Sequence, residues 1–229
     1  MPPEILFITS YPPRECGIAT YSQDLITALN KQFDSSFSIR VCALESEIEQ
    51  HRYDDIVRFA LNTEHEDDYA TLASTIQQDE SIELIVVQHE FGFFHSRSIA
   101  FISFLYQLEK PIIIVFHTVL PHPDAKLKST VLLMADASTT ILVMTNSSRD
   151  ILINEYGIID SKIVVIPHGT HLLPHADKTS LKIKHGVFGK LVLSTFGLLG
   201  SGKNIETTLY ALPAIVQQFP EVVFMIIGK

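Results

Sequence analysis

Short apolar segments alternate along the chain with longer stretches in which apolar residues recur every three or four positions. The short segments predict strands, and the longer stretches predict amphipathic helices. Residues 84–87 and 112–115 are apolar at every position, so both faces of those strands are expected to be covered. Alternating helices and strands of this kind predict an α/β fold with a doubly wound, mostly parallel Rossmann-like sheet.

The pattern divides the chain into three parts. The predicted strands of the first part are residues 5–9, 38–43, 56–59, 82–88, 111–116, 140–144 and 162–166. The predicted helices between them are residues 18–32, 69–78, 98–108, 125–135 and 147–156. A second α/β unit has predicted strands at residues 191–196 and 222–227 around a helix at residues 204–218. We therefore predict an N-terminal Rossmann-like domain at residues 1–169, a linker with a short helical piece at residues 170–188, and the start of a second domain at residues 189–229.

The second unit is short for a domain that folds alone. We expect it to be an incomplete Rossmann-like domain with uncovered strand edges. Residues 222–227 form an uncharged, β-prone run, and such a run with a free edge predicts self-association through this strand.

Composition excludes several classes of function. With 46% hydrophobic residues, 19% charged residues and a net charge of −9, the chain is predicted to be globular and not to bind nucleic acid. The two cysteines lack metal-type spacing, and the sequence shows neither a signal peptide nor a membrane-spanning run, which predicts a cytoplasmic protein. Peripheral membrane contact and a small anionic ligand both remain compatible with this composition.

Candidate ligand-binding residues follow the predicted strands, because ligands of open α/β sheets lie beyond the carboxyl ends of the strands. His89, Glu90 and His117 occupy such positions, where they either face a cleft or form an ordinary polar sheet edge. Gly17 opens the first helix, as a turn glycine or as a place where phosphate approaches backbone N–H groups. His89 and Glu90 lack zinc-site spacing, and Gly92 disfavours a helix there, so we predict no metal site.

Residues 197–204, G-L-L-G-S-G-K-N, match the P-loop pattern except at the last position. Asn204 stands where a Ser or Thr would hold Mg²⁺, which argues against an ATPase. The glycine turn, the helix start and Lys203 still predict a phosphate cradle.

Taken together, the loops resemble those of the glycosyltransferases of family 4, which have the GT-B fold of two Rossmann-like domains facing a cleft. The stretches that carry the resemblance are residues 11–20 (Y-P-P-R-E-C-G-I-A-T), 88–92 (Q-H-E-F-G), 115–118 (V-F-H-T), 165–169 (V-I-P-H-G), and 196–206 with 211–213. The first stretch resembles a bacterial, mannosyltransferase-like subgroup.

The resemblance implies roles for particular residues. His117 would be catalytic and face the transferred sugar, and Lys203 would bind the donor diphosphate. The residues implied in donor-diphosphate or substrate binding are Arg14, Gly17, Glu90, Gly169 and Lys203. The chain departs from the family pattern before Lys203, where an expected Arg is missing, and at His171, where an acid is common.

The implied reaction is transfer of a sugar, with retention, from a GDP- or UDP-linked donor to a glycan or lipid-linked acceptor. Mannose is the sugar that the subgroup suggests. No metal or other cofactor is implied, and the reaction would occur in the cytoplasm, with the inner membrane face as an alternative site. The family's E-x7-E segment does not occur, so we expect this chain alone to be inactive.

Two other interpretations remain open. The chain is alternatively a non-catalytic module that binds the acceptor or docks to a separate donor-domain chain. A sugar-nucleotide epimerase of similar double-Rossmann shape also fits the fold. The first-loop and Lys203 motifs favour transfer over epimerisation.

Overall fold

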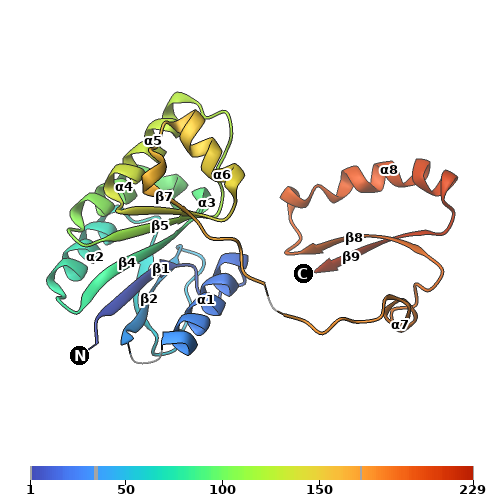
Figure 1. Ribbon diagram of the computed structural model, residues 1–229, viewed down its shortest axis with the longest axis horizontal. Coiled ribbons are helices and arrows are strands. Elements are labelled where there is room, and N and C mark those ends of the chain that lie inside the picture. The colour runs from blue at the N-terminus through green and yellow to red at the C-terminus, as the bar shows by residue number, and fades with distance from the viewer. Residues whose placement is uncertain (1, 34–35, 171, 229) are drawn as a thin grey trace. The chain divides into compact units, whose positions relative to one another are not determined.

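The computed structural model describes residues 2–33, 36–170 and 172–228. The chain divides into two compact units, residues 1–169 and residues 170–229 (Figure 1).

The first unit is built on a seven-stranded parallel sheet in the order β3-β2-β1-β4-β5-β6-β7 (Figure 1). Its strands are β1 (Glu4–Thr9), β2 (Ser38–Glu45), β3 (Val57–Asn62), β4 (Ile82–His89), β5 (Ile112–Phe116), β6 (Thr140–Val143) and β7 (Ile163–Val165). Its α-helices are α1 (Gly17–Phe33), α2 (Glu66–Gln78), α3 (Phe91–Phe94), α4 (Ser98–Gln107), α5 (Ala125–Ala137) and α6 (Asn146–Ile151). The shorter helical segments are η2 (His95–Arg97), η3 (Leu152–Tyr156) and η4 (Asp160–Lys162). The predicted doubly wound parallel sheet is confirmed.

Both faces of the sheet are covered, as the continuous apolar strands predict. Alternate residues of β4 point to opposite faces, so Ile85 and Val87 join one core and Val86 joins the other. The larger core includes residues of α2, α4 and α5, among them the fully buried Phe104. The smaller core packs against α1 through Ile26. Burying each such side chain contributes about 1.5–3 kcal/mol, which makes the sheet a rigid support for its loops.

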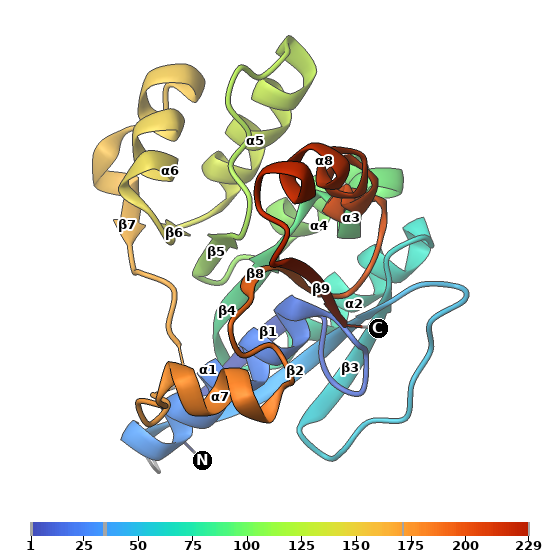
Figure 2. The same ribbon diagram turned by 90° about the vertical axis from the view of Figure 1, so that its right-hand side faces the viewer.

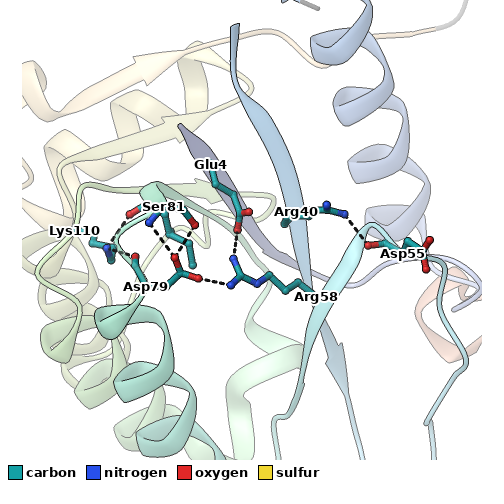
Figure 3. A network of polar contacts seen from close by, with 8 residues as sticks. Glu4, Arg40, Asp55, Arg58, Asp79, Ser81 and Lys110 are labelled. Carbon is teal, nitrogen blue, oxygen red and sulfur yellow. Dashed lines mark hydrogen bonds and ion pairs between the residues drawn. The ribbon is translucent and has the colours of Figure 1, made fainter. Parts of the chain in front are cut away.

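A polar network ties together the amino ends of the strands (Figure 3). The Arg58 guanidinium at the start of β3 pairs with Glu4 of β1 at 2.9 Å and with Asp79, which precedes β4. Asp79 also accepts hydrogen bonds from the backbone N–H and hydroxyl of Ser81, and these bonds together with Arg58 hold its pKa below the ordinary value. The Lys110 ammonium, just before β5, donates to the Asp79 carbonyl at 2.9 Å. Four strands are therefore linked at this edge.

Two local structures differ from the sequence-based expectation. Gly92 lies inside α3, although it was expected to disfavour a helix. The helix forms because the Glu90 carboxylate accepts a hydrogen bond from the Phe91 N–H at 3.0 Å, and because Phe94 is buried. The helix predicted at residues 147–156 continues as α6 only to Ile151 and then becomes the π-helical turn η3.

The second unit contains α7 (Lys178–Lys184), β8 (Leu191–Gly197), η5 (Ser201–Lys203), α8 (Ile205–Gln218) and β9 (Val222–Gly228). The two strands pair in parallel, and α8 lies over one face of the pair (Figures 1 and 2). Gly228 approaches Gly197 so closely that a Cβ at Gly228 would lie 1.9 Å from the Gly197 carbonyl oxygen. Within the described residues, β9 has no strand neighbour besides β8. Self-association through β9 stays a prediction.

In the part of the chain that the structure describes, no helix has the length and apolar character needed to cross a membrane.

Candidate functional site

The carboxyl ends of the parallel strands meet at one edge of the first unit. The strand order reverses between β1 and β4, because the chain winds outward in opposite directions from this pair. Such a reversal opens a crevice that binds ligands in open α/β sheets. The ends of β4 and β5 are joined directly, since the His117 N–H donates to the His89 carbonyl at 3.1 Å. Loops from four strands contribute polar side chains to this edge.

His117 lies at the centre of a cluster of polar and aromatic side chains. Its Nε2 is 2.7 Å from Oε1 of Gln88, which is completely buried at the end of β4. Its ring meets the Tyr21 ring edge-on, with centroids 5.0 Å apart, and Tyr21 in turn contacts the His168 ring at 5.0 Å. Burial, together with the nearby His168, lowers the pKa of His117 to about 4. The imidazole is therefore neutral at pH 7.

His89 is a core residue. Its side chain is 2% exposed and contacts four phenylalanine rings at centroid distances of 4.9 to 6.0 Å. Burial, followed by the effect of His117, lowers the pKa of His89 to about 3. The sequence left two interpretations of His89, a side chain that faces a cleft or an ordinary polar residue at the sheet edge. The structure excludes the first, because the side chain lies in the core.

Glu90 connects two loops of the edge. One carboxylate oxygen accepts from the Phe91 N–H, and the other accepts from the Thr118 hydroxyl at 2.6 Å. The half-buried carboxylate thereby fixes the residue that follows His117. A direct contact of Glu90 with a substrate stays a prediction.

Arg14 already has partners inside the first unit. Its guanidinium pairs with Glu49 at 2.6 Å, donates to the Leu44 carbonyl at 3.2 Å, and lies over the Phe93 ring at 5.4 Å. These contacts hold the first loop against the end of β2 and offset part of the positive charge. Arg14 therefore offers a ligand less charge than the sequence alone suggests.

Gly17 and Gly169 are both exposed and open. A Cβ on either residue would meet nothing within 4 Å, so neither glycine is required by the packing around it. Gly17 is the first residue of α1, and the first N–H groups of a helix have no partner within the helix itself. Binding of an anion there stays a prediction. The Gly169 carbonyl accepts a 2.6 Å hydrogen bond from Nδ1 of His168, which brings Gly169 to the His117 cluster.

Lys203 belongs to the glycine turn of the second unit. Gly197 has φ of +114°, and a Cβ there would lie 3.3 Å from the Lys203 ammonium nitrogen, so the side chain lies back over the turn. Asn204, at the start of α8, has a left-handed backbone conformation. Its side-chain oxygen accepts a hydrogen bond from the Thr207 hydroxyl at 2.8 Å. The Lys203 ammonium therefore lies over the glycine turn that precedes α8, and binding of phosphate there stays a prediction.

The structure brings some predicted residues together and adds others. His117, Glu90 and Gly169 lie around one edge of the first unit, whereas Lys203 lies in the second unit. Gln88 and His168 lie within two of the sequence motifs, which indicate no role for either residue, and Tyr21 lies outside all of the motifs. His171 lies outside the described residues. Among the described residues, no three His, Cys, Asp or Glu side chains are grouped as metal ligands.

Comparison with protein families matches residues 16–172 to Glycosyltransferase Family 4. Comparison with curated proteins gives no match. Among solved structures, a UDP-GlcNAc 2-epimerase from Methanocaldococcus jannaschii is 14% identical over 98% of this chain, with a TM-score of 0.55. A glycosyltransferase from Rickettsia africae is 13% identical over 98%, with a TM-score of 0.58. An alpha-glucosyltransferase in complex with UDP and a 13-mer DNA is 8% identical over 96%, with a TM-score of 0.53.

The likeness to these structures shows the fold alone, because the identities are low. This chain covers 65, 68 and 55% of the lengths of the three chains, respectively. The family match covers most of the first unit, including the loops that carry His117 and Glu90.

Proposed function

Because the chain belongs to glycosyltransferase family 4, we propose that it acts as a retaining glycosyltransferase, or as part of one. The proposed reaction transfers a sugar from a GDP- or UDP-linked donor to a glycan or lipid-linked acceptor. Mannose is the first sugar to test. An alpha-glucosyltransferase of similar fold is described in complex with UDP, so UDP-linked sugars belong among the donors to test.

The observation that carries this proposal is the His117 cluster at the carboxyl edge of a sheet matched to the family. A neutral imidazole there can exchange hydrogen bonds with sugar hydroxyl groups without adding charge. In the second unit, the Lys203 ammonium and the start of α8 supply positive charge for the diphosphate that leaves. Protein groups thus supply the charge stabilisation, and we propose that no metal or other cofactor is needed.

A lipid-linked acceptor would place the reaction in the cytoplasm, at the inner face of the membrane. Nucleic acid is not a proposed partner, because the net charge of −9 opposes binding to phosphate backbones. The epimerase alternative shares the fold, and the family match favours transfer.

The test incubates the full chain with UDP- and GDP-linked sugars and a lipid extract, and measures released nucleoside diphosphate and glycosylated product. Binding of UDP and GDP is measured in parallel by calorimetry. We expect UDP or GDP to bind to the chain, with an affinity that falls about tenfold in Lys203→Met. We expect no turnover by this chain alone, and any glycosylated product that does form should be lost in His117→Ala. Conversion of one sugar nucleotide into its epimer, without transfer, would support the epimerase. Absence of turnover together with absence of nucleotide binding by the folded chain would contradict the proposal.

A further inference from the structure

Gln88 is a buried polar residue that follows the apolar run Leu84–Val87 of β4. Its side chain is 0% exposed, and it lies on the face of β4 that α1 covers. Burying an amide costs free energy unless its groups find hydrogen-bond partners. The Gln88 carbonyl oxygen is 2.7 Å from Nε2 of His117, while the buried amide nitrogen has no hydrogen-bond partner in the part of the chain that the structure describes. The folding of the strand does not require a buried amide at this position. Within the described residues, the hydrogen bond to His117 is the one contact that distinguishes Gln88 from an apolar residue.

This contact determines which nitrogen of His117 carries the proton. An amide carbonyl oxygen only accepts hydrogen bonds, and therefore the His117 Nε2 facing it must be the donor. A neutral imidazole has one proton, so Nδ1 then holds a lone pair. Among the described residues, His117 Nδ1 has no hydrogen-bond partner, and it is not one of the buried unpartnered polar atoms.

The rest of the cluster limits how the ring can turn. Tyr21 of α1 packs edge-on against His117, with an interplanar angle of 88°, and also contacts His168. The His117 backbone is fixed by its N–H bond to the His89 carbonyl. With the ring edge at Tyr21 and Nε2 at Gln88, the orientation of the imidazole is determined from two sides.

We propose that Gln88 is a positioning residue that holds His117 in the neutral Nε2–H tautomer and thereby leaves the Nδ1 lone pair as a hydrogen-bond acceptor for a sugar hydroxyl. This inference extends the proposed function, because only under that function is the bound group a sugar hydroxyl. The tautomer itself is a property of the free protein and can be measured without any transferase activity.

The opposite orientation of the Gln88 amide makes the opposite prediction. If the amide group faced His117, it would donate to Nε2, and the proton of the neutral ring would lie on Nδ1. The Nδ1 atom would then be a donor toward a ligand. The two arrangements are thus distinguished by one observable, the tautomer of His117.

The test is long-range ¹H–¹⁵N NMR of the histidine rings in the ¹⁵N-labelled full chain at pH 7.5, with His117→Gln used to assign the signals. Protonated and unprotonated ring nitrogens give well separated ¹⁵N shifts. We expect the Nε2–H form in the wild-type chain. In Gln88→Met, which keeps the side-chain length and removes the acceptor, the ratio of Nε2–H to Nδ1–H should fall by roughly threefold to tenfold.

A second variant keeps the inference testable if Gln88→Met does not fold. In Gln88→Glu the acceptor becomes a carboxylate, which stabilises the imidazolium, so the pKa of His117 should rise by more than one unit. The ionisable groups near His117 that stay unchanged in this variant are His89, His168, Tyr21 and Glu90. Ser22→Ala is the matched control, because Ser22 is buried on α1 and bonds to Thr9 instead of His117. The tautomer ratio of His117 in Ser22→Ala should equal that in the wild-type chain.

An Nδ1–H tautomer in the wild-type chain would overturn the inference. So would a tautomer ratio in folded Gln88→Met that equals the wild-type ratio, or a pKa of His117 that does not rise in Gln88→Glu. If the tautomer behaves as expected while the folded chain neither turns over nor binds a sugar nucleotide, the positioning role stands and the proposed function fails. The two proposals can therefore be separated.

Discussion

The Thr118 hydroxyl donates a 2.6 Å hydrogen bond to the Glu90 carboxylate, whose other oxygen caps α3 at the Phe91 N–H. A single side chain thus joins the loop after β4 to the loop after β5. His117 lies between the strand end and Thr118, so this bond also limits the movement of the central imidazole.

A double-mutant cycle on Glu90→Gln and Thr118→Val should show coupling. Hydrogen bonds to charged groups contribute about 1.5–3 kcal/mol, so each single variant should lower the free energy of unfolding by roughly 1–2 kcal/mol. The coupling free energy should be about 1 kcal/mol, measured by urea denaturation. Thr71→Val, which removes a hydroxyl bond on exposed α2, is the control and should change stability by less than about 0.5 kcal/mol. Additive effects of the two variants would contradict the role given to this bond.

His117 should make the first unit less stable in acid. Its pKa is lowered by burial, and then by His168, from 6.5 to about 4, so the unfolded chain binds more protons between those two pH values. The contribution to stability is therefore complete above pH 6.5 and is lost as the pH falls toward 4. After allowance for partial exposure, the loss should be about 1–2 kcal/mol. Urea denaturation at several pH values should show that the free energy of unfolding depends less steeply on pH in His117→Gln than in the wild-type chain. An equally steep slope in this variant would contradict the prediction.

His89 should contribute to acid sensitivity in the same direction. Burial among phenylalanine rings lowers its pKa to about 3, so its contribution is complete above pH 6.5 and is lost as the pH falls toward 3. Phe in this position cannot be protonated and matches the surrounding rings. We expect His89→Phe to move the midpoint of acid unfolding to lower pH, followed by circular dichroism. An unchanged midpoint would show that protonation of His89 does not drive acid unfolding.

Arg14 should act more on the fold than on nucleotide binding. The Glu49 carboxylate offsets its charge, and its guanidinium lies over the Phe93 ring, so Arg14→Met should lower the free energy of unfolding by about 1 kcal/mol. Because Lys203 has no carboxylate partner among the described residues, Lys203→Met should weaken binding of UDP or GDP more than Arg14→Met does. Calorimetry on both variants checks this order. The reverse order would return Arg14 to the role that the sequence implies.

Gly228→Ala should destabilise the second unit. A Cβ there would lie 1.9 Å from the Gly197 carbonyl oxygen, which is backbone and cannot move without disturbing the β8–β9 pair. We expect a loss of roughly 2–3 kcal/mol, seen as faster hydrogen exchange of β8 and β9 amides in the full chain. Gly202→Ala is the control, since a Cβ at Gly202 meets nothing within 4 Å. Equal exchange rates in both variants would contradict the close approach.

The sheet could be predicted because its strands are apolar on both faces. Segments such as residues 84–87 and 112–115 leave few alternatives to a parallel sheet between two layers of helices, and the structure confirms this. Helix ends were less predictable, because they depend on caps made by side chains outside the apolar pattern. Gly92 illustrates this limit, since the Glu90 carboxylate and the buried Phe94 outweigh its low helix propensity.

The position of His117 could be predicted from its place after a buried strand, but the partners of His117 could not. Gln88 belongs to another strand, and its contact depends on the register that pairs Gln88 with Val115. Tyr21 and His168 are separated by most of the first unit in sequence, and only the folded sheet brings their rings together. The pairing of Arg14 with Glu49 joins two loops in the same way. Contacts of this kind carry no local signal in the sequence.

The network of Glu4, Arg58, Asp79 and Lys110 has a consequence for how this chain can evolve. It fastens the strands at the edge opposite to His117, with ion pairs that do not depend on the loops at the carboxyl ends. Loops anchored only at their bases tolerate substitution, because the scaffold beneath them keeps its free energy of folding. Selection can therefore change the chemistry at one edge of this sheet while the opposite edge preserves its architecture.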